Sequence, residues 1–125
     1  MPKVECSKKD LEALVGKKFS KEELEEAVLF VKGELDAMDG DKIVIDIKDP
    51  NRPDLWSAEG IARALRAAYG KEKGAVKIST KKSNWKLLID KSVEEVRPVM
   101  VAAIARNIRV TEDFLIQMIQ LQEKV

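Results

Sequence analysis

Residues 49–66 read DPNRPDLWSAEGIARALR, and this stretch decides how the middle of the chain folds. Pro50 and Pro53 each fix their own φ angle and bias the preceding residue away from helix. Asn51 and Asp54 have side chains that hydrogen-bond nearby backbone in tight turns. The first part of the stretch therefore predicts a rigid, polar turn.

A helix is predicted directly after this turn. Ser57 is a typical N-cap residue, and Gly70 is a typical helix end, so we expect a helix over about residues 57–69. Small and aliphatic residues form a narrow apolar stripe along it, which favours close packing: Ala58, Ile61, Ala62, Leu65 and Ala68.

Two further helices are expected near the amino terminus. Ser7 predicts the cap of a short helix that stops at Gly16. Ser20 and Glu23 have the spacing of a capping box, in which each residue satisfies a backbone N–H of the other. The helix that follows is predicted to stop at Gly33, with apolar residues at helical spacing: Leu24, Val28, Val31 and Leu35.

A β-hairpin is predicted between these helices and the proline-containing turn. Residues 34–38 and 41–47 flank Asp39-Gly40, a pair suited to the positive φ angles of a tight turn. The second strand alternates apolar and polar residues, so one of its faces should be buried, with Ile43, Ile45 and Ile47 on it.

Beyond the third helix, short strands are expected at residues 75–79, 85–89 and 97–105. A final helix is expected from Thr111, with Phe114, Met118, Leu121 and Val125 along one side. The weakest join in the chain lies at residues 80–84. The segments after it do not make a domain unaided, because their apolar faces need another sheet.

Length and composition limit the classes of protein. The 125 residues suit one compact domain, or one small domain and part of another. No apolar run is long enough for a membrane helix and no leader begins the chain, so we expect a soluble, intracellular protein. The single Cys6 suits a reducing compartment. Charged residues make up 36% of the chain, and this composition favours a thermophilic source.

The chain contains no His. With one Cys and no His, zinc sites and Cys-His or Ser-His nucleophile pairs are excluded, and carboxylate, Lys or Tyr chemistry remains. No catalytic residue and no metal ligand is predicted. The acidic residues after Ser20 are interpreted as the solvated face of a helix rather than as a metal site: Glu22, Glu23, Glu25 and Glu26.

The net charge of +1 conceals a division along the chain. Residues 1–62 carry −5, residues 63–91 carry +7 and residues 92–125 carry −1. A basic segment between acidic ones favours contact with phosphate or with an acidic surface. Together with Trp85 it makes a stand-alone nucleic-acid-binding module the alternative function, with RNA contacts from Lys77, Lys81, Lys82 and Lys86.

The motif at residues 49–66 closely resembles the segment that ends the first module of the phenylalanyl-tRNA synthetase beta subunit, of the archaeal and eukaryotic type. That family usually has Thr where Pro50 stands here. Further blocks resemble the amino-terminal region of the same subunit in the same order: residues 1–4 (MPKV), 7–11 (SKKDL), 32–36 (KGELD), 71–74 (KEKG), 90–93 (DKSV), 97–98 (RP) and 118–124 (MIQLQEK).

The resemblance implies an α+β fold in two parts. Residues 1–84 would be the first module, a small helix-and-hairpin unit of winged-helix-like type. Residues 85–125 would be the opening strands and helix of an editing module, which is incomplete here.

The resemblance also implies a function. The parent enzyme attaches phenylalanine to its tRNA with ATP and Mg²⁺, and its beta subunit clears misactivated tyrosine. No position of this chain matches a catalytic motif, so the expected role is non-catalytic scaffolding and docking. The expected partners are the rest of the beta subunit, the alpha subunit and, through the complex, tRNA. A homodimer formed through unpaired strands is a further expectation.

The motif itself is expected to act as architecture, through Asn51, Arg52, Pro53, Asp54, Trp56, Ser57, Glu59 and Gly60. Arg52 is expected to pair with Asp54, with Glu59 or with a carboxylate of a neighbouring module. Trp56 is expected to cover the core with its ring and to donate its indole N–H to a carbonyl.

Overall fold

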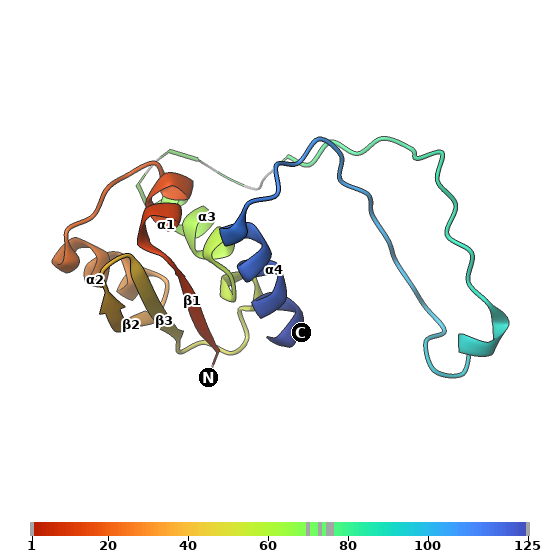
Figure 1. Ribbon diagram of the computed structural model, residues 1–125, viewed down its shortest axis with the longest axis horizontal. Coiled ribbons are helices and arrows are strands. Elements are labelled where there is room, and N and C mark those ends of the chain that lie inside the picture. The colour runs from red at the N-terminus through yellow and green to blue at the C-terminus, as the bar shows by residue number, and fades with distance from the viewer. Residues whose placement is uncertain (1, 70, 73, 75–76, 125) are drawn as a thin grey trace. The chain divides into compact units, whose positions relative to one another are not determined.

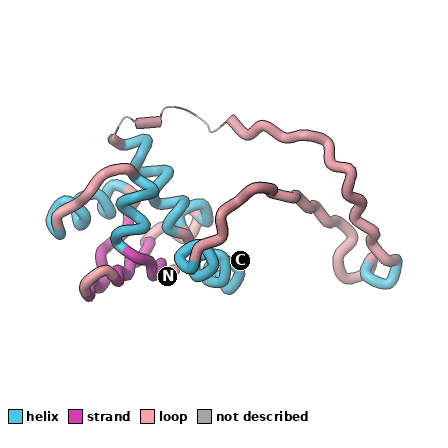
Figure 2. Tube along the Cα trace, turned by 45° about the horizontal axis from the view of Figure 1, so that its top comes forward, coloured by secondary structure: helices cyan, strands magenta, loops and turns pink. Residues whose placement is uncertain are grey.

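The computed structural model describes residues 2–69, 71–72, 74 and 77–124 (Figures 1 and 2). The chain divides into two compact units. The first unit combines the residues up to 74 with those from 110 onward, and the second holds residues between them. The mixed α+β class and the small helix-and-hairpin module predicted from the sequence are confirmed.

A three-stranded antiparallel sheet forms the base of the first unit (Figure 1). Its strands are β1 (Lys3–Ser7), β2 (Gly33–Asp39) and β3 (Lys42–Ile47), in the order β1-β3-β2. The predicted hairpin is confirmed, and Gly40 has the positive φ of 55° that its turn requires. The sequence did not indicate β1, because a strand of 5 residues with two charged ones gives a weak pattern.

The two amino-terminal helices begin where their caps predict. Helix α1 (Lys8–Val15) starts at Ser7 and ends at Gly16, which has a φ of 74°. Helix α2 (Lys21–Phe30) starts with both hydrogen bonds of the capping box.

The predicted helix stop at Gly33 is wrong, because α2 ends at Phe30 and Gly33 already belongs to β2. Gly33 has a packing role instead. A Cβ atom there would lie 2.9 Å from Val28 Cγ1 and 3.2 Å from Ile45 Cγ2, so the backbone of β2 can approach α2 closely.

The remaining helices of the first unit are α3 (Ala58–Ala68) and α4 (Glu112–Lys124). Residues from the sheet and from α1, α2 and α3 form one core. The predicted buried faces of β3 and α3 are confirmed, except that Ala68 is exposed. The largest fully buried side chains are Leu11, Leu24, Ile43, Ile45, Ile47, Leu55, Ile61, Leu65, Val4, Val15 and Val28.

The second unit is extended, with one short 3-10 turn, η2 (Lys91–Val93). Within described residues 77–109 no residue lies in a strand, so the predicted strands at 85–89 and 97–105 are wrong, as is the described part of the one at 75–79. A strand requires a neighbour for its backbone, and here side chains such as Leu88 and Val101 are about nine-tenths exposed, at 89% and 91%.

Some predictions fall outside the described residues. They concern Gly70 as the end of α3, Ala75 and Val76 in a strand, and Val125 on the last helix. The boundary predicted at residue 84 also differs from the division into compact units, since the residues from 110 onward pack with the first unit. Over the part of the chain that the structure describes, every helix is too short or too polar to cross a membrane.

Candidate docking joint

The proline-containing turn and the start of α3 form a compact corner, residues 49–60, which we call the joint. The Asp49 carboxylate accepts a hydrogen bond from the Asn51 backbone N–H at 3.2 Å. The 3-10 turn η1 (Pro53–Leu55) follows, and the Leu55 N–H donates to the Arg52 carbonyl at 2.9 Å. Asp49, rather than Asn51, therefore supplies the side-chain acceptor that closes the turn.

Gly60 allows the turn to lie directly against α3. A Cβ atom at this position would stand 1.7 Å from the Asp54 carbonyl oxygen, which is far inside van der Waals contact. Ser57 caps the helix by accepting a hydrogen bond from the Gly60 N–H at 3.2 Å. Leu55 and Ala58 are buried on either side of this contact. The joint is thus built on backbone-to-backbone proximity that no other residue type at position 60 permits.

Arg52 pairs with Asp54, which was one of the partners the sequence suggested. The guanidinium donates from Nε and Nη2 to the two carboxylate oxygens at 2.9 and 2.8 Å. Hydrogen bonding to Arg52 lowers the pKa of Asp54 against the opposing effect of burial. Both side chains are about half exposed, at 49% and 52%, so water competes strongly for the pair.

Because this pair is exposed, replacing Arg52 by Gln should leave the stability of the module nearly unchanged. The measurement is a thermal unfolding curve followed by circular dichroism, at low salt and at about 1 M salt, where surface ion pairs are screened. A large loss of stability with Arg52→Gln would mean that the pair, rather than the backbone packing at Gly60, holds the joint together.

Trp56 is half-buried within the joint, and the hydrogen bond predicted for its indole N–H is wrong. The indole N–H is buried without an acceptor among the described residues, although a carbonyl partner was expected. The Trp56 backbone carbonyl instead accepts from the Lys124 ammonium of α4 at 3.2 Å. Glu59 is half-buried in the first turn of α3, where a carboxylate suits the helix dipole.

The residue that attaches α4 to the joint was not predicted from the sequence. Gln117 is 3% exposed, and its side-chain oxygen accepts from the Ala58 N–H at 3.0 Å while its nitrogen donates to the Glu5 carbonyl at 2.7 Å. Gln120 accepts from the Glu5 N–H at 3.1 Å and donates to the Glu5 carbonyl at 2.7 Å. Two amides of α4 therefore pair with the outer edge of β1 in place of a neighbouring strand.

One signal in the sequence points to these contacts. Gln117, Gln120 and Lys124 lie three and four residues apart, so they share one face of a helix. The predicted apolar side of this helix is only partly buried: Phe114 and Leu121 are half-buried, whereas Met118 is 52% exposed.

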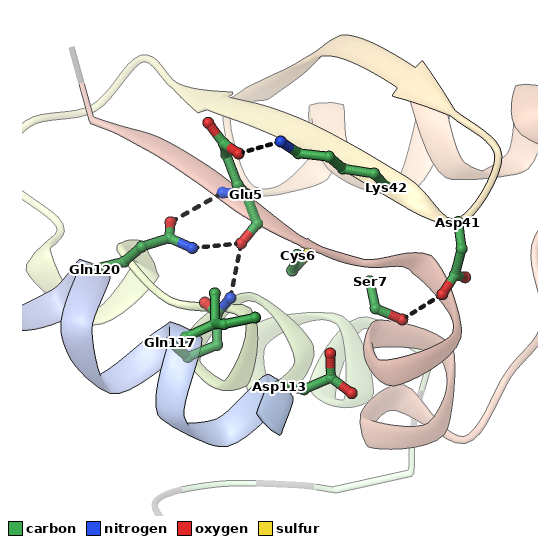
Figure 3. A pocket seen from close by; sticks show the side chains of 9 residues that line it. Glu5, Cys6, Ser7, Asp41, Lys42, Asp113, Gln117 and Gln120 are labelled. Atoms are coloured by element: carbon green, nitrogen blue, oxygen red, sulfur yellow. Dashed lines mark hydrogen bonds and ion pairs between the residues drawn. The ribbon is translucent and has the colours of Figure 1, made fainter. Parts of the chain in front are cut away.

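A cavity of about 460 Å³ lies between α4, β1 and the hairpin turn (Figure 3). Its rim is held by the Ser7 hydroxyl, which donates to Asp41 at 2.8 Å, and by the Lys42–Glu5 ion pair at 2.7 Å. Cys6 lines its wall. Burial, followed by the nearby carboxylate of Asp10, raises the pKa of the Cys6 thiol to about 12. Burial raises the pKa of Asp10 as well, with smaller contributions from Asp113 and Glu59.

The raised pKa predicts an inert thiol at Cys6. At pH 8 the folded chain should react with iodoacetamide at least about a hundredfold more slowly than the chain in denaturant, since the thiolate is the nucleophile. The unfolded chain releases the thiol proton near its ordinary pKa of 9.0, and the folded chain keeps it until about 12, so the free energy of unfolding should fall as the pH rises across that window. Rapid alkylation of the folded chain at pH 8 would contradict this assignment.

The candidate RNA-contacting residues belong to the second unit, whereas the joint belongs to the first. Lys77, Lys81, Lys82 and Lys86 follow one another along an extended segment, and their side chains are exposed. Trp85 among them is 68% exposed. Their contact with RNA stays a prediction.

The polar contacts of the joint and of α4 hold the chain's own backbone in place, and this is the geometry of an architectural module. No protein-family model matches the chain. Individual relatives do. The chain is 50% identical to the phenylalanine–tRNA ligase beta subunit of Pyrococcus horikoshii, 49% identical to that of Thermococcus kodakarensis and 38% identical to that of Pyrobaculum aerophilum. Each match covers 100% of this chain.

A solved structure agrees with these matches. The crystal structure of an N-terminal fragment of the phenylalanyl-tRNA synthetase beta subunit from Pyrococcus horikoshii superposes with a TM-score of 0.90 at 50% identity, over 98% of this chain and 37% of that one. Over its whole length the chain is therefore homologous to the amino-terminal region of archaeal phenylalanine–tRNA ligase beta subunits. It spans 23% of the length of the relatives from Pyrococcus horikoshii and Pyrobaculum aerophilum, and 22% of the length of the one from Thermococcus kodakarensis.

Proposed function

We propose that this chain is a non-catalytic scaffolding and docking part of a phenylalanine–tRNA ligase beta subunit. The observation that carries the proposal is the match at 50% identity along the entire chain, together with the same fold in the solved fragment. The joint supports it, because a turn packed backbone-to-backbone on a helix holds two elements at a fixed angle.

In this proposal the parent enzyme attaches phenylalanine to its tRNA in the cytoplasm, using ATP and Mg²⁺ bound outside this chain. The partners are the rest of the beta subunit and the alpha subunit, with tRNA bound by the whole complex. Residues 1–84 form the first module, and the editing module begins at about residue 85. The exposed apolar residues of the second unit then pair with strands of that editing module, and α4 packs back onto the first module.

A chimera tests the proposal. The 125 residues of this chain replace the matching region of the Pyrococcus horikoshii beta subunit, and the product is purified with the alpha subunit of that organism. We expect the two subunits to associate and to charge tRNA with phenylalanine. The native beta subunit is the positive control, and a beta subunit lacking the matching region is the negative control. A chimera that behaves like the truncated subunit would refute the proposal.

The alternative, a stand-alone nucleic-acid-binding module, makes a different prediction for the 125-residue chain alone. Contacts from the exposed lysines to phosphate would give tRNA binding that is strongest at low salt and falls steeply as salt is added. We expect no retention of tRNA at about 50 mM salt. Retention that is lost in Lys81→Gln, Lys82→Gln chains would favour the alternative.

A further inference from the structure

Helix α4 has its polar and apolar residues on unexpected sides. Its buried residue is Gln117, whereas Leu115, Ile116, Met118 and Ile119 are 50%, 42%, 52% and 57% exposed. A surface helix ordinarily turns its apolar stripe toward the core and its polar residues toward water. In α4 the most deeply buried residue is polar, and the apolar Phe114 and Leu121 beside it are only half-buried.

The hydrogen bonds on the inner side of α4 prevent the helix from rotating its exposed apolar residues toward the core. The Gln117 amide uses both of its ends, on the Ala58 N–H and on the Glu5 carbonyl. The Lys124 ammonium reaches the Trp56 carbonyl two helical turns further on. Rotation about the helix axis would break these bonds and leave the buried Ala58 N–H without an acceptor. The apolar residues are therefore held away from the core of the module.

Three of these residues form one continuous surface, which we call the outward face of α4: Leu115, Met118 and Ile119. Ile116 instead lines the cavity between α4, β1 and the hairpin turn. Positions three and four apart are neighbours on a helix, so the side chains lie together. The face contains no charged residue, and the exposed acidic residues Glu112 and Glu123 lie at the two ends of the helix. A phosphate backbone would require cations here. The face therefore fits an apolar polypeptide surface.

We propose that the outward face of α4 docks onto an apolar surface of the polypeptide that follows α4 in the full-length beta subunit. The inference rests on the proposed function, since it takes the longer relatives as the context of this chain. Those relatives are about four times as long as the matched region, which is 23% of their length. A single helix face is far smaller than the roughly 800 Å² per partner that a stable dimer buries, whereas a tethered partner acts at an effective concentration in the millimolar range.

Cysteine alkylation in the chimera described above tests this docking. Ile119→Cys is made in the 125-residue chain and in the chimera complexed with the alpha subunit, and each is treated with iodoacetamide. We expect alkylation at position 119 to be at least about tenfold slower in the complex, which corresponds to about 1.4 kcal/mol of docking free energy. Glu26→Cys on the exposed side of α2 is the matched control, and its rate should change much less. Cys6 is buried in this chain, so its own alkylation should be slow.

The outcomes distinguish a failure of the docking proposal from a failure of the proposed function. If the complex charges tRNA with phenylalanine but position 119 stays as reactive as in the 125-residue chain, the docking surface is wrong and the proposed function stands. If the chimera neither associates with the alpha subunit nor charges tRNA, the proposed function fails, and the docking inference fails with it. Equal protection of positions 26 and 119 from alkylation would also overturn the proposal. So would protection of position 119 in the 125-residue chain that rises with protein concentration, because it would mean that a second copy covers the face.

Discussion

Replacing Gly60 by Ala is expected to destabilise the first unit by about 4 kcal/mol or more, a loss that single substitutions cause only when they create a severe steric clash or a comparable defect. The added Cβ would lie 1.7 Å from the Asp54 carbonyl oxygen. That oxygen belongs to the backbone, and the turn that carries it is stiffened by Pro53. Relieving this steric clash therefore requires the whole turn to move away from α3, which exposes Leu55 and Ala58. Guanidinium unfolding of the 125-residue chain, followed by circular dichroism, measures the loss.

Gly40→Ala is the matched control for this substitution. Gly40 also has a special conformation, with a φ of 55°, but nothing lies within 4 Å of a Cβ atom there. Its replacement should therefore cost about 1–2 kcal/mol of backbone strain and no more. If Gly60→Ala destabilises the chain no more than Gly40→Ala does, then the close approach of the turn to α3 is not what holds the joint.

Replacing Gln117 by Met is expected to cost about 2–3 kcal/mol and to loosen α4. Met has a similar volume but cannot accept from the Ala58 N–H, which is then buried without a partner. The Glu5 carbonyl keeps its bond from Gln120, so most of the loss comes from Ala58. Hydrogen exchange should show faster exchange of the Ala58 amide and of the α4 amides, with the amides of β3 much less affected.

Gln122→Met is the control on the same helix, because Gln122 is exposed and its replacement should change stability by less than about 0.5 kcal/mol. Equal stability of the Gln117→Met and Gln122→Met chains would show that the buried amide contributes nothing to the attachment of α4. Unchanged exchange in α4 would contradict the prediction in the same way.

Local patterns predicted much of the fold because the relevant interactions are local. The capping box at Ser20 and Glu23 closes within four residues, and the hairpin needs only Asp39-Gly40 and the alternating residues of β3. The proline-containing turn was predicted because proline restricts φ whatever surrounds it. For the candidate site, the sequence predicted the turn of the joint. It also predicted a carbonyl acceptor for the Trp56 indole N–H that the described residues do not provide, and it gave no prediction for Gln117.

The predicted strands of the second unit show where local patterns fail. Residues 85–89 and 97–105 have the composition of buried strands, yet they lie extended and exposed. A strand is defined by hydrogen bonds to a neighbour, and that neighbour is not specified by the segment itself.

The amino-acid sequence by itself determined the helix caps, the hairpin and the proline-stiffened turn, since each depends on the conformational preferences of a few adjacent residues. The tertiary structure alone decided three things: that β1 pairs with β3 in the sheet, that Gly60 must lack a side chain, and that α4 turns Gln117 toward the joint while Leu115, Met118 and Ile119 stay exposed. The first and the third depend on groups that are distant in the chain and meet only when it folds, such as the backbone of Glu5 and Ala58 and the side chain of Gln117. The second depends on how closely the turn packs against α3, which brings the Asp54 carbonyl onto Gly60.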